Sequence, residues 1–139
     1  MKHLIGIGTD IIKTSRIKNS IKNKKFIKRI YSSEEIKIAK NINRNYNYFA
    51  KRYCAKEAFV KALGTGFSCN ISFKDISILN DNKGKPFIKL NQKIKDIIKK
   101  RLRIKNFSTY VSISDEREYS IAFVIINRKW KYHSKSKKI

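Results

Sequence analysis

Two carboxylates of this chain, Asp10 and Glu57, lie among apolar residues, where a charge is costly unless it is paired or bound to an ion. Asp10 follows the apolar run of residues 3–9, and Glu57 lies in the middle of residues 49–66, FAKRYCAKEAFVKALGTG. Mg²⁺ binds proteins through one or two carboxylates together with water and substrate phosphate. The two acids could therefore hold a magnesium ion if the segments that carry them meet.

Each carboxylate also has a purely structural interpretation that the sequence leaves open. Asp10 could be a turn or helix-cap residue before the next segment. Glu57 could form a salt bridge with Lys61, four residues on, in the favourable order with the acid first.

A lysine and a glycine loop follow Glu57 closely. Lys61 lies one helical turn later and nearer the loop Gly64-Thr65-Gly66. A lysine, a metal ion and exposed loop amides together could hold a pyrophosphate. Arg52 and Lys56 form a second basic pair on another face of the same segment, where they could equally be a solvated edge of the helix.

These residues need a long helix to position them. Residues 48–63 are apolar on almost every side at helical spacing, which is typical of a buried helix. Gly64 is suited to end it in the left-handed conformation. A buried helix that carries one acid and three bases is expected to form the wall of a polar site.

The remaining pattern predicts an α+β domain with a small, mainly antiparallel sheet packed on this long central helix. Ser32 and Glu35 form a capping-box signature for a short helical segment that runs to about Lys40. We expect strands at 3–9, 73–80, 85–90, 109–114 and 119–127, and helices at 14–31 and 91–104. The domain would span residues 1–127, followed by a basic, flexible tail at 128–139.

Composition sets limits on the partners. The 139 residues suffice for one domain, and 34 Lys and Arg against 10 Asp and Glu give a net charge of +24. This charge indicates a nucleic-acid or acidic-protein partner, or compositional drift, because Lys, Ile and Asn are abundant throughout. Cys54 and Cys69 form no C-x-x-C pattern, which favours reduced thiols in the cytosol. No run approaches the ~18 apolar residues of a membrane span.

Three signatures in order resemble the holo-acyl-carrier-protein synthase family, the small bacterial phosphopantetheinyl transferases. They are GIGTDIIKTSRI at 6–17, FAKRYCAKEAFVKALGTG at 49–66, and VSISDEREYSIAFVII at 111–126. The turn NKGKP at 82–86 is similar to a further family pattern. The resemblance covers about residues 3–127.

The resemblance implies transfer of 4′-phosphopantetheine from coenzyme A to a serine of apo acyl carrier protein, which leaves adenosine 3′,5′-bisphosphate. It implies that Asp10 and Glu57 hold Mg²⁺ on the pyrophosphate and that Lys61 stabilises the charge on the bridging phosphate. Glu57, directly or through a water molecule, is a candidate base for the serine proton, and a separate water is an equal alternative.

The resemblance further implies that Arg52, Lys56 and the loop Gly64-Thr65-Gly66 bind phosphate and nucleotide, and that Ser112 lines the adenine side. Arg16 matches a family arginine and is expected to dock the acidic carrier protein. The family implies a homotrimer with coenzyme A sites shared between subunits, in the cytoplasm and without a membrane.

Two rival functions remain to be weighed. A small basic nucleic-acid-binding module would explain the charge, although the sequence contains no RNP-like, helix-turn-helix or zinc pattern. A relative that keeps the fold but not the chemistry would be expected to lose Asp10, Glu57 and Lys61 first, and all three are present.

Overall fold

The computed structural model describes residues 3–64 and 71–129. The elements in chain order are β1 (Leu4–Lys13), α1 (Thr14–Ser20), α2 (Lys24–Ile30), α3 (Ser33–Ala39), α4 (Tyr46–Leu63), the 3₁₀ turn η1 (Phe73–Asp75), β2 (Ile76–Asn80), β3 (Pro86–Leu90), α5 (Gln92–Leu102), β4 (Phe107–Asp115) and β5 (Tyr119–Arg128).

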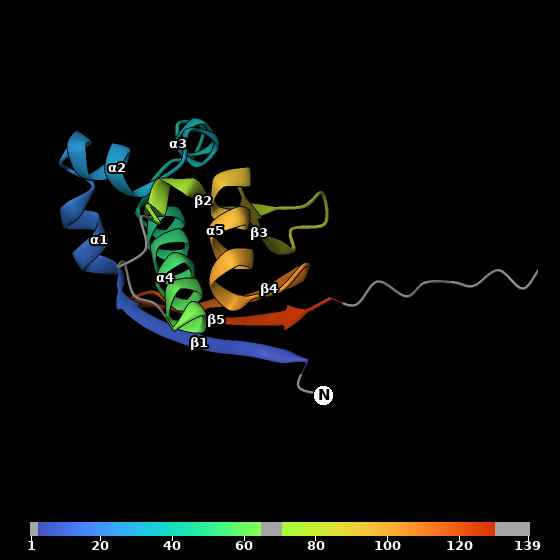
Figure 1. The fold of residues 1–139 in the computed structure, drawn as a ribbon. Coiled ribbons are helices and arrows are strands. Elements are labelled where there is room, and N and C mark those ends of the chain that lie inside the picture. Colours follow the sequence, from blue (N-terminus) through green and yellow to red (C-terminus); the bar gives the residue numbers. More distant parts are fainter. Residues whose placement is uncertain (1–2, 65–70, 130–139) are drawn as a thin grey trace, which may run out of the picture.

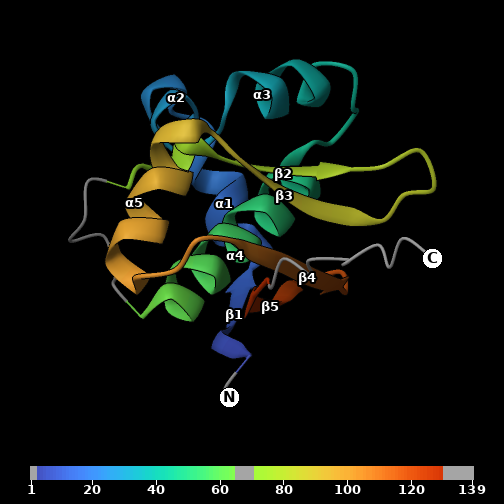
Figure 2. The same cartoon turned by 45° about the vertical axis from the view of Figure 1, so that its right-hand side comes forward.

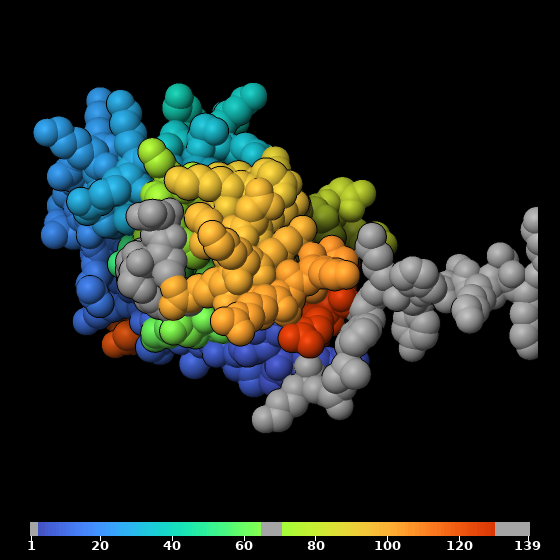
Figure 3. Space-filling model, viewed as in Figure 1, coloured from blue at the N-terminus to red at the C-terminus, as the bar shows by residue number. Residues whose placement is uncertain are grey.

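The fold is built in layers around α4. An antiparallel three-stranded sheet of order β1-β5-β4 lies along one side of this helix, as Figure 1 shows. The separate antiparallel hairpin β2–β3 packs with its β2 strand against α3 and α4, while β3 lies beside β4 at the edge of the sheet (Figure 2). In the space-filling view, α5 covers much of the face shown in Figure 3. The predicted α+β fold is confirmed.

The helix α4 forms the centre of the hydrophobic core. Ala50, Ala55, Ala58 and Phe59 have no exposed surface, and residues on all sides of the helix are buried. The prediction of a buried helix is therefore confirmed. The helix ends at Gly64, which has a φ of 69° and donates its N–H to the Lys61 carbonyl. This is the left-handed end that a glycine makes possible.

Strand β1 packs directly on the backbone of α4 because two of its residues lack a side chain. A Cβ atom added to Gly6 would lie 1.8 Å from the Ala62 carbonyl oxygen, and one added to Gly8 would lie 1.9 Å from the Ala58 carbonyl oxygen. Alternate residues of a strand point to the same face. Asp10 therefore follows Gly6 and Gly8 on the face that meets the helix.

The predicted position of Asp10 at the end of the first strand is wrong. Strand β1 continues to Lys13, and Asp10 pairs with Ala122 within the ladder. The strand is longer than its apolar run because β5 offers partners as far as Tyr119. The backbone of Asp10 is consequently fixed by its pairing with β5.

Other predicted boundaries also change. The helix expected at 14–31 is two helices, and Asn23 caps the second by accepting a hydrogen bond from the Lys25 N–H. The strand expected at 73–80 begins at Ile76, after η1, and is buried on both faces because α3 and α4 both contact it. Arg128, which the prediction assigned to the tail, belongs to β5. Residues 130–139 lie outside the described part.

The close contact between β1 and α4 predicts that Gly8→Ala destabilises the protein. The new methyl group would overlap the Ala58 carbonyl, and overpacking of this kind costs about 1–3 kcal/mol. Chemical denaturation should show a lower free energy of unfolding. Gly84→Ala is the matched control, because its Cβ meets open space and its cost is limited to backbone strain at a φ of 84°. A Gly8→Ala variant no less stable than Gly84→Ala would contradict the proposed packing.

Candidate functional site

Asp10 and Lys61 meet where β1 crosses α4. The Lys61 ammonium group lies 2.9 Å from Asp10 Oδ1 and 3.1 Å from the Thr9 carbonyl oxygen. The Asp10 side chain is 16% exposed and that of Lys61 is 54% exposed. The site is therefore a surface position at which one carboxylate is largely covered and the lysine reaches solvent.

Glu57 interacts electrostatically with both Asp10 and Lys61. Burial raises the pKa of its carboxyl group, and the negative charge of Asp10 raises it further. A hydrogen bond from Tyr53 and the charge of Lys61 act in the opposite direction. Lys61, which pairs with Asp10, lies one helical turn beyond Glu57 on α4, so the strand that carries Asp10 crosses the helix close to Glu57.

The structural alternatives for these acids do not hold. The N-cap of α1 is Lys13, so Asp10 does not cap that helix. Among the ion pairs of the described residues, Lys61 pairs with Asp10, and Glu57 appears in none.

The pair of acids suits a hard divalent cation. Residues 3–64 and 71–129 contain no cluster of three or more His, Cys, Asp or Glu side chains that could enclose a metal. Mg²⁺ does not need such a cluster, since it is commonly bound by one or two carboxylates with water and phosphate. A cation between Asp10 and Glu57 would also relieve the repulsion that raises the Glu57 pKa.

Cys54 links α4 to β1 next to Asp10. Its Sγ lies 3.1 Å from the Asp10 carbonyl oxygen and 3.4 Å from the Ser120 carbonyl oxygen, two acceptors within reach of its single S–H hydrogen. Burial raises the pKa of the thiol to about 12, so the group stays neutral. Cys54 is thus a buried core residue that also helps to fix β1.

Lys56 is not placed to bind phosphate, which corrects the role expected for it. Its side chain is fully buried, and Nζ lies 2.6 Å from Glu35 Oε2, 2.8 Å from the Ile30 carbonyl oxygen and 3.0 Å from the Phe73 carbonyl oxygen. Burial lowers the pKa of this lysine to about 8, although the Glu35 carboxylate opposes the shift. All three N–H donors are engaged within the fold.

Glu35 completes this buried arrangement. Its carboxylate accepts from the Ser32 N–H at 2.8 Å, as the predicted capping box requires, and from the Ile78 N–H at 2.7 Å. The carboxylate therefore links α3, α4 and β2, and its charge compensates that of Lys56.

Arg52 is also buried, with 6% of its surface exposed. Its guanidinium group lies 3.8 Å from the centre of the Tyr48 ring and donates through Nη2 to Asn80 Oδ1. The alternative of a solvated helix edge is wrong for both Arg52 and Lys56. A phosphate contact by Arg52 stays a prediction.

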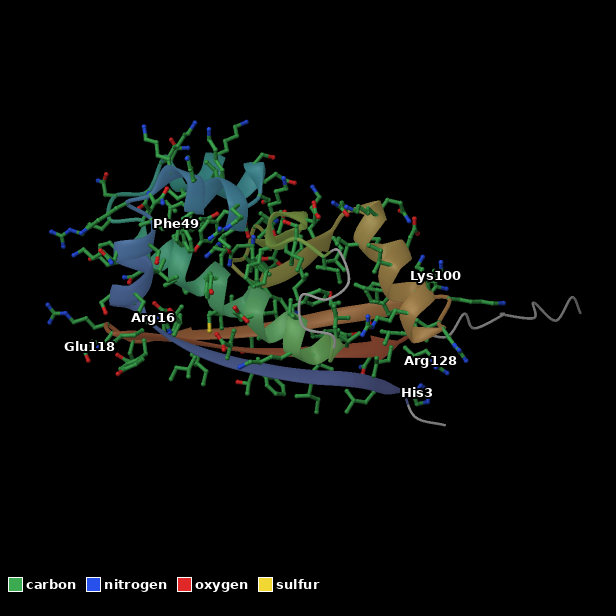
Figure 4. The ribbon with its side chains drawn as sticks, turned by 60° about the vertical axis from the view of Figure 1, so that its left-hand side comes forward. His3, Arg16, Phe49, Lys100, Glu118 and Arg128 are labelled. Carbon is green, nitrogen blue, oxygen red and sulfur yellow. The ribbon has the colours of Figure 1, made fainter. Side chains whose placement is uncertain are left out.

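Of the other predicted site residues, those that the structure describes lie at separate places on the surface. Gly64 is exposed at the end of α4, near Lys61, and Thr65 and Gly66 lie outside the described residues. Ser112 is exposed on β4, in register with Phe123 on the face of the sheet that points away from α4. Within one chain it therefore does not join the acids. Arg16 is exposed on α1, at the end of the molecule where β1 finishes (Figure 4).

Sequence reasoning did not identify two residues that shape this region. Glu35 was recognised only as a cap, because nothing local shows that its partner is a lysine 21 residues later. Tyr53 precedes Glu57 by one helical turn, and this i, i+4 spacing could have indicated contact. The sequence GIGTD also contains a signal for close packing. Gly6 and Gly8 alternate with Ile7, so one face of this strand has no side chains at these two positions.

The chain is similar to known proteins over most of its length. Residues 6–124 match the family model of the 4′-phosphopantetheinyl transferase superfamily. A holo-[acyl-carrier-protein] synthase of Pelagibacter ubique is 51% identical over 126 residues, which cover 91% of this chain and 98% of that protein.

Solved structures show the same similarity. The holo-[acyl-carrier-protein] synthase of Neisseria meningitidis is 36% identical with a TM-score of 0.80, over 91% of this chain and 99% of that one. The Bacillus anthracis enzyme in complex with CoA (3′,5′-ADP) is 32% identical with a TM-score of 0.77, over 92% and 100% of the two chains.

Proposed function

The chain belongs to the 4′-phosphopantetheinyl transferase superfamily, and from this membership and the site geometry we propose that it works as a holo-[acyl-carrier-protein] synthase. It transfers 4′-phosphopantetheine from coenzyme A to a serine of apo acyl carrier protein. The serine oxygen forms a bond to the phosphorus that carries pantetheine, and the bond from that phosphorus to the bridging oxygen breaks. Adenosine 3′,5′-bisphosphate leaves.

The observation that supports this proposal is the contact of Lys61 with Asp10 where β1 crosses α4, one helical turn from Glu57. We propose that the two carboxylates hold Mg²⁺. When bound, this ion neutralises charge on the pyrophosphate and fixes its orientation. Lys61, with its exposed ammonium group, would bind the bridging phosphate oxygen and stabilise the charge that develops there as the bond breaks.

Proton transfer needs a base near the attacking serine. We assign this task to Glu57, directly or through a water molecule, because it is half-buried and engaged in no ion pair among the described residues. Asp10 is less suited, since Lys61 already occupies one of its oxygens.

The exposed end of α4 would bind the rest of coenzyme A. Gly64 with Thr65 and Gly66 would bring backbone amides to the phosphates. Arg52 would contribute to phosphate binding, and Ser112 would line the adenine side of a neighbouring subunit's site, which its position on the outward face of the sheet allows.

The partner protein is proposed to be an acidic acyl carrier protein. Arg16 is exposed on α1, and its charge acts on Tyr53 beside Glu57, so a carrier docked there would lie close to the transfer site. The net charge of +24 would favour encounter with an acidic partner.

A homotrimer is supported by the outward face of the sheet. This face carries exposed apolar side chains in adjacent register, a pattern typical of an interface. They are Ile7, Ile11, Tyr110, Ile121 and Phe123, which are 41–61% exposed. Figure 4 shows mostly carbon atoms projecting from this side of the sheet. The number three follows from the family resemblance, and the site would be shared between neighbours.

A cytoplasmic location is proposed, in keeping with the free thiol of Cys54. No helix in the described residues has the length and apolarity to cross a membrane. The alternative of a nucleic-acid-binding module finds no support in the relatives, which are holo-[acyl-carrier-protein] synthases over nearly the full chain.

The metal role predicts that Glu57→Gln lowers the rate of transfer by at least about 100-fold without loss of the fold, because the amide supplies no negative ligand. The assay is Mg²⁺-dependent labelling of apo acyl carrier protein with a fluorescent coenzyme A derivative. Glu34→Gln, at an exposed ion pair with Lys89, is the control and should retain full rate. Wild-type rates in Glu57→Gln would remove Glu57 from its assigned role.

The docking role predicts that Arg16→Glu raises the KM for the carrier protein about tenfold or more, with little change in the KM for coenzyme A. Reversal of a charge at the interface replaces attraction with repulsion. Lys93→Glu, an exposed reversal on α5, should have a much smaller effect. Equal increases in both KM values for Arg16→Glu would refute a docking role.

The interface proposal predicts that sedimentation equilibrium gives a mass of three 16.4 kDa chains for the wild type. Phe123→Glu should dissociate this assembly, because it buries a charge among apolar side chains. A wild-type protein that stays monomeric at tens of micromolar would contradict the proposal.

A further inference from the structure

Lys61 and the proposed cation require the same carboxylate. The Lys61 ammonium group lies 2.9 Å from Asp10 Oδ1, the distance of a close ion pair. The proposed function assigns Asp10 to a divalent cation and Lys61 to a phosphate oxygen of coenzyme A. A lysine that stays on Asp10 reaches no phosphate and places its own positive charge beside the cation. One contact must therefore be exchanged for another when the ligands bind.

Lys61 is the partner that can move. Its side chain is 54% exposed and lies in the last turn of α4. Lysine has a flexible four-carbon stem. Asp10 is held more firmly, because its backbone pairs with Ala122 in the strand ladder and its carbonyl oxygen lies 3.1 Å from Cys54 Sγ. Its side chain is only 16% exposed. A rearrangement of the pair therefore requires movement of the lysine.

The two lysines nearest Glu57 along α4 differ in how firmly their ammonium groups are held. Lys56 is fully buried, and its Nζ has three acceptors for its three N–H donors. Lys61 has two acceptors, Asp10 Oδ1 and the Thr9 carbonyl oxygen at 3.1 Å. A solvent-exposed ion pair contributes little to stability. The contact between Lys61 and Asp10 can thus be exchanged at small cost, whereas that of Lys56 cannot.

We propose that Lys61 regulates the cation site: it competes with the divalent cation for Asp10 until a phosphate of coenzyme A binds the ammonium group instead. This inference rests on the functions proposed for Asp10 and Lys61. Two positive charges that share one carboxylate repel each other, even when the cation takes the second oxygen. Coenzyme A, by removing Lys61 from Asp10, would strengthen cation binding. By thermodynamic reciprocity the cation would strengthen the binding of coenzyme A.

The test is Lys61→Met, which removes the charge and keeps an unbranched side chain. Binding of Mn²⁺ alone to the full chain, without coenzyme A, is measured by electron paramagnetic resonance. We expect the Kd for Mn²⁺ to fall about threefold to tenfold, because no ammonium group competes for the carboxylate. A lysine that only held Asp10 in place would give the opposite sign, since its loss would weaken binding.

Lys51→Met is the matched control on the same helix. It removes the same charge from an exposed lysine whose partner is Asp115, at 3.8 Å. Its Kd for Mn²⁺ should stay within about twofold of the wild type, because distant surface charges are screened by salt. A Lys61→Met variant that binds Mn²⁺ no more tightly than Lys51→Met, or not at all without coenzyme A, would overturn the proposal.

The effect of coenzyme A on the same titration provides a second readout. The Kd for Mn²⁺ is measured again at concentrations of coenzyme A that saturate each protein. The ratio of the two Kd values, without and with coenzyme A, should be smaller in Lys61→Met than in the wild type by about threefold or more. Equal ratios would overturn the proposal, because the coupling would then not pass through Lys61.

Mn²⁺ titration of Asp10→Asn separates this proposal from the proposed function. If Asp10→Asn loses Mn²⁺ binding and Lys61→Met binds as the wild type does, the cation site stands and the competition fails. If Asp10→Asn binds Mn²⁺ as the wild type does, the proposed metal ligand is wrong, and competition for it fails as well.

Discussion

The structure depends on the direct contact between the backbone of β1 and the backbone of α4. Gly6 and Gly8 allow this contact, and Ala58 and Ala62 present the small surface that receives it. A side chain at either glycine would separate the two elements. Because strand residues alternate, the same register brings Asp10 to the helix one step beyond Gly8, where Lys61 and the charge of Glu57 meet it. The glycines that allow the close packing and the acid of the proposed site therefore lie on the same face of β1.

The opposite side of α4 is fixed by a buried ion pair. Lys56 and Glu35 share a short contact and satisfy main-chain groups of α2, α3, η1 and β2 around them. Removal of one partner would leave an uncompensated charge in the core, so the pair constrains how these segments sit on the helix. The charged residues of α4 thus divide into two groups. Lys56 holds the fold, whereas the neighbouring Glu57 and the later Lys61 face the site.

Much of this arrangement could be predicted from the sequence. The buried helix, its glycine end, the capping box and the α+β class all follow from local patterns, and the acids were recognised because charges among apolar residues need a reason. The function of Lys56 could not be predicted, since its burial depends on Glu35, which only tertiary packing brings near. The length of β1 was also missed, because the pairing with β5 extends the strand beyond Thr9, through Asp10 to Lys13.

Crystallography with coenzyme A and Mn²⁺, read by the anomalous signal of the metal, tests the central claim most directly. We expect one ion within about 2.5 Å of oxygens from both carboxylates, in contact with the diphosphate. An ion bound elsewhere, with the strand acid and the helix acid too far apart to share it, would contradict this account of the site.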